Sequence, residues 1–207
     1  WQQRDDVVQT TTPIAIPETK SHTTYTHPIA MESGEIIAIK SDLDKTEALV
    51  IIDPATGEER RVARTGYISS RPALSSTGRL WWTEYRRSAL FEQKVSSKLC
   101  YIDLESGQRE TLSDYDNVLY PTPTEGHGIA WVEYAWDGHY TIVVNGKSNI
   151  GQRVEIPMGK EIHGLAWDNT TEALYVIVTD DDGMHIARVE SDGLHKVTKA
   201  AYTTLSG

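Results

Sequence analysis

A repeat of roughly 45 residues organises this chain and restricts the folds that it can adopt more than any other feature does. Three segments align without gaps. In each, a proline is followed by a small or polar turn and then by an apolar residue or a tryptophan ten positions after the proline. These segments are 28–38, 72–82 and 121–131. A fourth copy, 165–175, keeps the turn and the apolar strand but lacks the proline.

The second half of each unit repeats as well. Segment 49–58 matches 99–108 in an apolar strand, an aspartate, a polar turn and a glycine, and 186–193 is a weaker third copy. Each unit holds four short runs of β-branched, aromatic or alternating residues, bounded by turn formers, which predict strands. No stretch keeps a helical period over eleven or more residues. Four-stranded antiparallel units at this spacing are typical of a β-propeller, whose blades surround a central channel.

The sequence therefore predicts an all-β chain of four consecutive four-stranded antiparallel blades with partial flanking strands. We expect the blades at 22–66, 67–116, 117–160 and 161–200. Residues 1–21 form a leading segment that can supply a strand to a flanking blade. Residues 201–207 are expected to begin a further blade.

The repeat resembles the TolB-type, WD40-like propeller repeat. In that family a Ser-Pro-Asp-Gly turn precedes a strand, and Tyr-x-x-Asp-x-x-x-Gly closes the third strand. Segments 72–82 and 99–107 carry the resemblance most clearly, and it extends loosely over 22–200. The turns 75–78 and 31–34 lack the Pro-Asp pair of the family. The resemblance implies a larger propeller of six or more blades, and it implies a periplasmic or cell-envelope location.

The composition is that of a globular protein, with 39% hydrophobic and 24% charged residues. The formal net charge is −10 and no Lys/Arg cluster is present, so we do not expect nucleic-acid binding. No apolar run approaches the ~20 residues of a membrane-spanning helix, so membrane insertion is not expected either. The single cysteine, Cys100, excludes an internal disulfide and a cysteine-based zinc site.

A polar residue precedes the proline of the repeat in three units: His27, Arg71 and Tyr120. In the fourth unit the corresponding residue is His163 or Gly164. Because this position begins the innermost strand of a blade, we expect these side chains to ring one mouth of the channel. Arginine and histidine suit a carboxylate or a peptide terminus through charge-assisted hydrogen bonds. The alternative is that these polar residues only face a water-filled channel.

Aromatic residues fall into two groups with different expected roles. Trp82, Trp131 and, in the fourth unit, Tyr175 align with one another in the repeat, so we expect them to be buried between neighbouring blades. A second group flanks the Asp-Gly turn of the third unit. Its members are Tyr134, Trp136 and Tyr140. This group either forms an exposed patch that anchors a partner or belongs to a loop folded over its own aromatic rings.

Motifs for metal binding and catalysis are missing from the sequence. The seven histidines are spread over all units, without a His-x-His or His-x-x-x-His pair. Segment 180–183 resembles half of a calcium loop but lacks the spaced ligands and the closing glutamate, and it is expected to be a hairpin turn. There is no Gly-x-Ser-x-Gly elbow and no glycine-rich phosphate loop. Cys100 lies in a predicted buried strand, so we assign no catalytic residue, metal or cofactor.

These features predict a non-catalytic binding or scaffolding module that engages a protein or peptide partner through its loops and channel mouth. The alternative is a propeller domain that gates or assists a hydrolase of the peptidase type, with the active site elsewhere in a longer chain. That alternative comes from the resemblance, because propellers of this kind also occur beside peptidase domains. A hydrolase motif in sequence beyond residue 207 would favour it.

Overall fold

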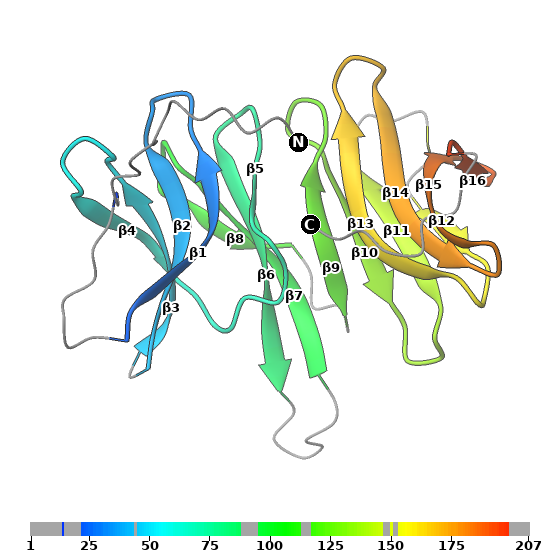
Figure 1. Cartoon of the computed structure of the whole chain (residues 1–207), viewed down its shortest axis with the longest axis horizontal. Helices are drawn as coiled ribbons and strands as arrows, with labels where there is room; N and C mark the ends of the chain where they lie inside the picture. The colour runs from blue at the N-terminus through cyan, green and yellow to red at the C-terminus, as the bar shows by residue number, and fades with distance from the viewer. Residues whose placement is uncertain are drawn as a thin grey trace, which may run out of the picture. The chain divides into compact units, whose positions relative to one another are not determined.

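Four antiparallel sheets, each made of four strands in chain order, form the computed structural model (Figure 1). The structure describes residues 14, 22–43, 45–87, 95–112, 117–146, 150 and 153–198. Those ranges contain no helix. The predicted all-β class and the four four-stranded antiparallel sheets are thus confirmed. Except for Ile14, the predicted leading segment 1–21 lies outside the described residues, as does 201–207.

The chain divides after Arg64 into two compact units. The first unit holds sheet 1, with strands β1 (Thr24–Ala30), β2 (Ile36–Asp42), β3 (Lys45–Ile52) and β4 (Glu59–Arg64). Its central strands bury both faces, with Ile37 and Leu49 on one face and Ala38 and Val50 on the other. Burial on both faces explains why β2 and β3 are continuous apolar runs and do not alternate.

The second unit holds the other three sheets. Sheet 2 contains β5 (Ala73–Leu74), β6 (Arg79–Arg87), β7 (Val95–Asp103) and β8 (Arg109–Thr111). Sheet 3 contains β9 (Val118–Pro123), β10 (Ile129–Tyr134), β11 (Tyr140–Asn145) and β12 (Arg153–Ile156). Sheet 4 contains β13 (Glu161–Asp168), β14 (Ala173–Asp180), β15 (Gly183–Glu190) and β16 (Gly193–Lys196). First strands of successive sheets are neighbours, because β9 contacts both β5 and β13.

The Asp-x-x-x-Gly motif of the repeat closes the hairpin between the third and fourth strands. Asp53 and Asp103 each accept a hydrogen bond on a side-chain oxygen from a backbone N–H two residues later. Gly57 and Gly107 then donate their N–H groups to the carbonyl oxygens of those aspartates, each at 2.8 Å. Both glycines have φ near +70°, at +73° and +72°. The motif recurs because this turn needs one residue with a left-handed backbone conformation, which glycine adopts easily, and one short side chain that accepts a hydrogen bond.

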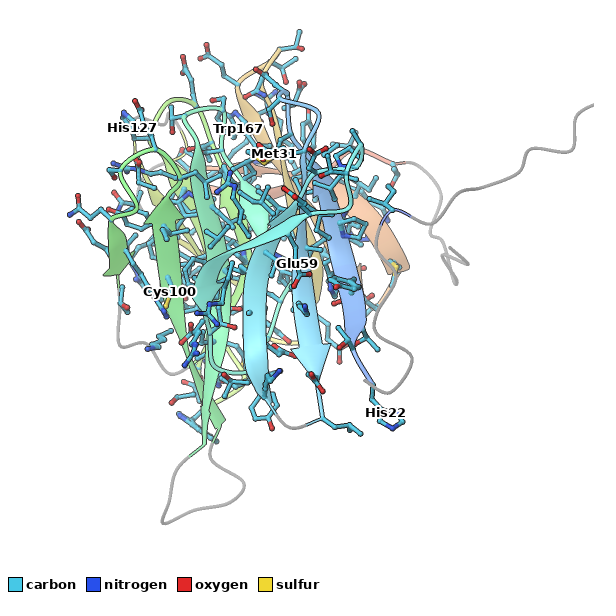
Figure 2. All side chains as sticks on the ribbon, turned by 90° about the vertical axis from the view of Figure 1, so that its left-hand side faces the viewer. His22, Met31, Glu59, Cys100, His127 and Trp167 are labelled. Atoms are coloured by element: carbon cyan, nitrogen blue, oxygen red, sulfur yellow. The ribbon has the colours of Figure 1, made fainter. Side chains whose placement is uncertain are left out.

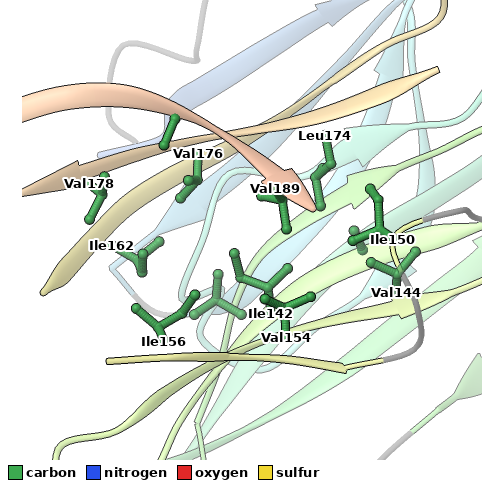
Figure 3. Packing of buried hydrophobic residues seen from close by; sticks show 13 residues of the cluster. Ile142, Val144, Ile150, Val154, Ile156, Ile162, Leu174, Val176, Val178 and Val189 are labelled. Carbon is green, nitrogen blue, oxygen red and sulfur yellow. The ribbon is translucent and has the colours of Figure 1, made fainter. Parts of the chain in front are cut away.

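Two apolar cores connect the three sheets of the second unit. The first lies between sheets 2 and 3 and consists of Trp81, Leu99, Tyr101, Val118, Ile129, Trp131 and Val143. The second lies between sheets 3 and 4, and its β-branched and leucine side chains interdigitate from both sheets (Figure 3). Full burial of each large aliphatic side chain contributes on the order of 1.5 to 3 kcal/mol, so face-to-face sheet packing is the main source of stability here.

Two of the three aromatic residues predicted to be buried are buried. Trp82 is 0% and Trp131 4% exposed, whereas Tyr175 is only half-buried, so the prediction for Tyr175 was wrong. The first hairpin of sheet 4 is one residue shorter, since Asp168 pairs with Ala173 while Pro123 pairs with Ile129 in sheet 3. A one-residue shift moves side chains to the opposite face. Residues 174 and 176 therefore face sheet 3, and Tyr175 faces away from it.

Candidate functional site

The four channel-mouth candidates lie on, or just before, the first strands of their sheets. His27, Tyr120 and His163 lie at β-bulges, where the first strand has one residue more than its partner. His27 and Tyr120 both have φ of +53°, which is uncommon for a residue with a Cβ atom. A bulge changes the direction of a side chain and interrupts pairing. In sheets 1 and 3 the residue before the proline thus lies at a bulge and has left-handed backbone geometry.

Three of these candidates belong to the second unit. Arg71 is exposed beside buried Pro72, ahead of β5. Tyr120 is half-buried and packs against the core between sheets 3 and 4. His163 is exposed, and its Nε2 lies 2.8 Å from Oγ1 of Thr179. Their first strands are neighbours, but their arrangement around one channel mouth, together with His27 of the first unit, stays a prediction.

The aromatic group of the third sheet surrounds one hairpin. Tyr134 ends β10 and Tyr140 begins β11, and the two residues are direct cross-strand partners. Their ring centroids lie 4.6 Å apart with the rings tilted by 39°, and both side chains are half-buried. Trp136, in the connecting turn, is 54% exposed. The hairpin thus packs two aromatic rings on each other and presents the third to solvent.

Sequence reasoning missed two further exposed aromatic residues, one on β6 and one in the segment before β5. Tyr67 is 71% exposed and Tyr85 is 45% exposed, and the Tyr85 N–H donates to the Tyr67 carbonyl oxygen at 2.8 Å. Burial raises the pKa of Tyr120, and the neighbouring Tyr85 raises it further. The repeat did contain a signal, because Tyr85 and Tyr134 both follow the aligned tryptophan by three positions.

We call this region the tyrosine surface. It consists of Tyr67, Tyr85, Tyr120, Tyr134, Trp136 and Tyr140. Burial is the main cause that raises the pKa of Tyr140, and Tyr134, Glu161 and Tyr120 add to the shift in that order. Tyr120 thus interacts electrostatically with Tyr85 of sheet 2 and with Tyr140 of its own sheet. A hydroxyl-bearing aromatic surface of this kind offers both apolar contact and hydrogen bonding.

A buried carboxylate in sheet 2 has a structural role. Glu84 is 5% exposed and accepts hydrogen bonds from Trp82 Nε1 at 2.9 Å and from Arg109 at 2.6 Å. Lys98 Nζ lies 3.4 Å from its other oxygen. Two cations and an indole N–H satisfy the hydrogen-bonding and charge requirements of this buried carboxylate. Its surroundings therefore do not indicate a role in acid–base chemistry.

Sheet 3 has a similar but more exposed arrangement. Trp131 Nε1 donates to Glu133 at 3.1 Å, and Arg153 donates to the same carboxylate at 2.7 Å. The side chain of Glu133 is 16% exposed and that of Arg153 is 50% exposed. The hydrogen bond within the Trp-x-Glu pair therefore recurs on the second strands of sheets 2 and 3.

One group of metal-ligating residue types comes together at the hairpin between β15 and β16. Ligand atoms of Glu190, Asp192 and His195 lie within 4.8 Å of one another. The group is internally paired, since His195 Nε2 lies 2.8 Å from Asp192 and 3.8 Å from Glu190. Arg188 places a positive charge 3.6 Å from Glu190. These contacts explain the cluster as surface ion pairs of a hairpin.

Two further sequence interpretations can be located in the structure. Cys100 is fully buried within β7, away from both ends of the strand, and burial raises the pKa of its thiol (Figure 2). The thiol is therefore protonated and inert at neutral pH. In the segment that resembles a calcium loop, Asp180 accepts a hydrogen bond from the Asp182 N–H and pairs with Lys160 at 2.8 Å. It forms the turn between β14 and β15, as a hairpin turn should.

Solved structures with the same architecture identify the fold. TolB from Acinetobacter baumannii superposes with a TM-score of 0.61 and 12% sequence identity, over 85% of this chain and 44% of that one. The four sheets are blades of a β-propeller. An oligogalacturonate lyase in complex with manganese gives a TM-score of 0.61 at 14% identity, over 85% of this chain and 53% of the lyase. The chain thus spans about half the length of these two proteins.

Propeller domains of enzymes are similar as well. A prolyl endopeptidase structure superposes with a TM-score of 0.60 at 14% identity, over 86% of this chain and 30% of the enzyme. No protein-family model matches the sequence, and no curated protein sequence is significantly similar to it. The resemblance to TolB-like propellers is thus confirmed at the level of the fold. No helix among the described residues is both long and apolar enough to cross a membrane.

Proposed function

We propose that this propeller segment is a non-catalytic binding module that engages a protein or peptide partner through the tyrosine surface of blades 2 and 3. The observation that carries the proposal is the exposure of Tyr67, Tyr85 and Trp136 at 71%, 45% and 54%. Tyrosine and tryptophan are enriched among the residues that dominate binding energy at protein interfaces. An array of them from two sheets is more than the scattered apolar residues that any surface carries.

The channel-mouth candidates extend this proposal. Tyr120 belongs both to the tyrosine surface and to the pre-proline set with His27, Arg71 and His163. Arg71 would supply a fixed positive charge for a carboxylate, such as the C-terminus of a peptide. A peptide bound at the tyrosine surface would then place its end near Arg71. Replacing Arg71 by alanine is expected to weaken the binding of a peptide with a free C-terminus and to leave its amidated form unaffected.

A periplasmic or cell-envelope location, and a protein partner there, are part of the same proposal. They rest on the likeness of the fold to TolB. The net charge of −10 supports a protein partner over a nucleic acid.

A second candidate function is that of a propeller domain that gates or assists a peptidase-type hydrolase. The likeness to the propeller of a prolyl endopeptidase favours it. Since the sequence contains no nucleophile elbow, the catalytic residues of such an enzyme would lie in another part of a longer chain. Peptidase activity of the full-length protein that is lost when this segment is deleted would support the second candidate.

The binding proposal is tested by affinity capture from an envelope extract, with identification and purification of the retained protein. Trp136→Ala and Tyr67→Ala are each expected to weaken direct binding of the purified partner at least tenfold. Leu43→Ala is the matched control, because Leu43 is 75% exposed and belongs to the first unit. Equal loss of binding in the control, or unchanged binding in both aromatic variants, would contradict the proposal.

A further inference from the structure

The chain that leads into β5 is interrupted more strongly than the first strands of the other sheets. Ile68 is a bridge partner of Glu84, and Ala73 pairs with Trp81. Between these pairs the chain advances five residues, from 68 to 73, while β6 advances three, from 81 to 84. Sheets 1, 3 and 4 have one extra residue at the corresponding place. Segment 69–72 therefore forms a wider bulge, which we call the blade 2 bulge.

Three hydroxyl groups meet at the blade 2 bulge. The Oγ atoms of Ser69 and Ser70 each lie 2.6 Å from Oγ1 of Thr83, which is fully buried in β6. Consecutive side chains of a regular strand point to opposite faces. Since two consecutive serines contact one atom, the chain leaves strand geometry here and directs both hydroxyls to the same place.

This hydroxyl cluster has one more proton than its own contacts can use. Three hydroxyls carry three protons, and each of the two contacts uses one of them. Because Thr83 is fully buried, leaving its proton without an acceptor would be costly, so Thr83 donates to one of the serines. The remaining proton then belongs to Ser69 or Ser70 and has no acceptor among the described residues. Both serines are half-buried, so a bound ligand can reach this proton.

Further donors of the blade 2 bulge are unused within the described part of the chain. The N–H of Ser69 donates to the Thr83 carbonyl oxygen at 2.9 Å, but the N–H groups of Ser70 and Arg71 donate to no acceptor there. Arg71 is exposed, and its guanidinium forms no ion pair with a described residue. Because consecutive Cα atoms are about 3.8 Å apart, this long side chain can reach a group bound at Ser70.

The blade 2 bulge adjoins the tyrosine surface. Tyr85 follows Thr83 by two residues on β6, so both side chains lie on the same face of the sheet, with Cα atoms about 7 Å apart. That face also carries Trp81, which packs in the core between sheets 2 and 3. The N–H of Tyr85 donates to the carbonyl oxygen of Tyr67, two residues before Ser69. An extended peptide on these tyrosines therefore needs only a few residues to reach the bulge.

We propose that the blade 2 bulge binds a carboxylate of the partner. A hydroxyl of Ser69 or Ser70 and the N–H groups of Ser70 and Arg71 are its neutral donors, and the Arg71 guanidinium is its charged donor. The inference rests on the proposed function and adds the groups that hold the carboxylate beside Arg71. Two carboxylate oxygens with about four acceptor positions match several donors of which one is charged. The C-terminus of a peptide is the expected source, because backbone N–H groups capture terminal carboxylates in known recognition modes.

The test is an NMR titration of the isotopically labelled intact chain, which follows the backbone N–H signals. The probes are acetyl-Gly-Tyr-Ala with a free C-terminus, the amide of the same peptide, and the amide of acetyl-Gly-Tyr-Glu. The free acid should shift the signals of Ser70 and Arg71 and should bind at least about tenfold more tightly than its amide. Absence of these shifts, or equal binding of the amide, would overturn the inference. Tighter binding of the glutamate peptide would overturn the assignment to a C-terminus.

Substitutions in the bulge separate its charged donor from its neutral ones. Arg71→Ala should weaken binding of the free acid about tenfold or more, because it removes a charge-assisted hydrogen bond. Arg71→Lys, which keeps the charge but loses the planar fork, should weaken it about threefold. The double variant Ser69→Ala with Ser70→Ala removes the unused hydroxyl proton and should weaken it about threefold to tenfold.

Matched controls distinguish a site from general charge attraction. Arg61 is an exposed arginine of β4, and Ser76 is an exposed serine of the turn between β5 and β6. Arg61→Ala and Ser76→Ala should both bind as the parent does. Equal loss in Arg61→Ala and Arg71→Ala, or unchanged binding in the double serine variant, would contradict the site as proposed. Inorganic phosphate that binds as tightly as the free acid, with the same shifts, would overturn the assignment to a carboxylate.

Failure of this inference and failure of the proposed function give different results. If a purified natural partner loses affinity with Trp136→Ala but keeps it with Arg71→Ala and with the double serine variant, the binding function stands and the bulge site is rejected. If none of these substitutions weakens that partner, both are rejected. Weakening by all three, together with loss of binding on amidating the C-terminal peptide of the partner, is the result that we expect.

Discussion

Blades 2 and 3 share a Trp-x-Glu pair on the second strand, but its surroundings differ. In blade 2, the side chain of Glu84 is 6% exposed and pairs with two cations, whereas the side chain of Glu133 in blade 3 is 16% exposed and pairs with one. The indole N–H donates to the carboxylate in both blades. The repeat thus determines which groups meet, and burial determines how much each contact contributes to stability.

The largest expected effect concerns the tryptophans, for which the two blades should behave alike. Trp82→Ala and Trp131→Ala should each lower the free energy of unfolding by roughly 3 to 5 kcal/mol, because both remove a buried aromatic side chain and leave a cavity. Urea denaturation of the purified chain measures this change. In blade 4, Tyr175→Ala should cost about 1 kcal/mol, since Tyr175 is only half-buried. An equally large loss there would contradict the shifted register of β14.

Substitution of the two glutamates should affect stability differently in the two blades. Glu84→Gln is expected to lower the free energy of unfolding by about 2 to 3 kcal/mol, somewhat less than the roughly 3 to 5 kcal/mol of a broken, fully buried pair, because Arg109 and Lys98 remain partly hydrated. Glu133→Gln should cost about 1 kcal/mol or less. Repeating the denaturation at high salt sharpens the comparison, since the effect at Glu133 should shrink while that at Glu84 persists. Equal costs for both variants would show that burial does not distinguish the two pairs.

The smallest expected effect on stability comes from blade 4, where Asp192 and His195 form an exposed pair within the hairpin between β15 and β16. The hydrogen bond to Asp192 raises the pKa of His195, and the hydrogen bond from His195 lowers the pKa of Asp192. The contribution of His195 is therefore complete below the unfolded pKa of about 6.5 and is lost as pH rises through the raised value. The contribution of Asp192 is lost as pH falls through its lowered value.

An NMR titration of the His195 ring protons tests this pair. The pKa should lie above about 6.5 in the parent chain and return toward that value in Asp192→Asn. Glu172→Gln, which removes an exposed acid from another turn of blade 4, is the control and should leave the titration unchanged. A His195 pKa that does not respond to Asp192→Asn would show that the hydrogen bond between them does not form in solution.

The sequence predicted the features that recur and missed those that depend on one blade. Gapless alignment of the first halves led to four sheets and to the burial of Trp82 and Trp131, because hairpin lengths and inward positions repeat together. Tyr175 was misassigned, since a turn shorter by one residue is hard to distinguish from a substitution when the proline is also missing. Tyr85 could have been found by extending the alignment beyond Trp82.

The candidate site was harder to predict than the fold. Tyr134, Trp136 and Tyr140 could be recognised as aromatic residues around a turn, but their exposure depends on packing between sheets that no local pattern encodes. Tyr67 lies outside the aligned strands, so the repeat gave no reason to select it. The packing of Tyr120 and Tyr140 against the core between sheets 3 and 4 joins two blades, and the repeat period and turn chemistry describe only contacts within one blade.

The extra residue in the first strand has a consequence for how this chain can change in evolution. Deleting the extra residue at His27, Tyr120 or His163 would remove the bulge but keep the residue pairs on both sides of it. Deleting a residue elsewhere in these strands would instead shift the register and turn the side chains on one side of the deletion to the opposite face. Among related sequences, deletions within these first strands are therefore expected at the bulge and not at other positions. Hairpin turns at the blade ends, with hydrogen bonds that close within a few residues, should accept both insertions and deletions.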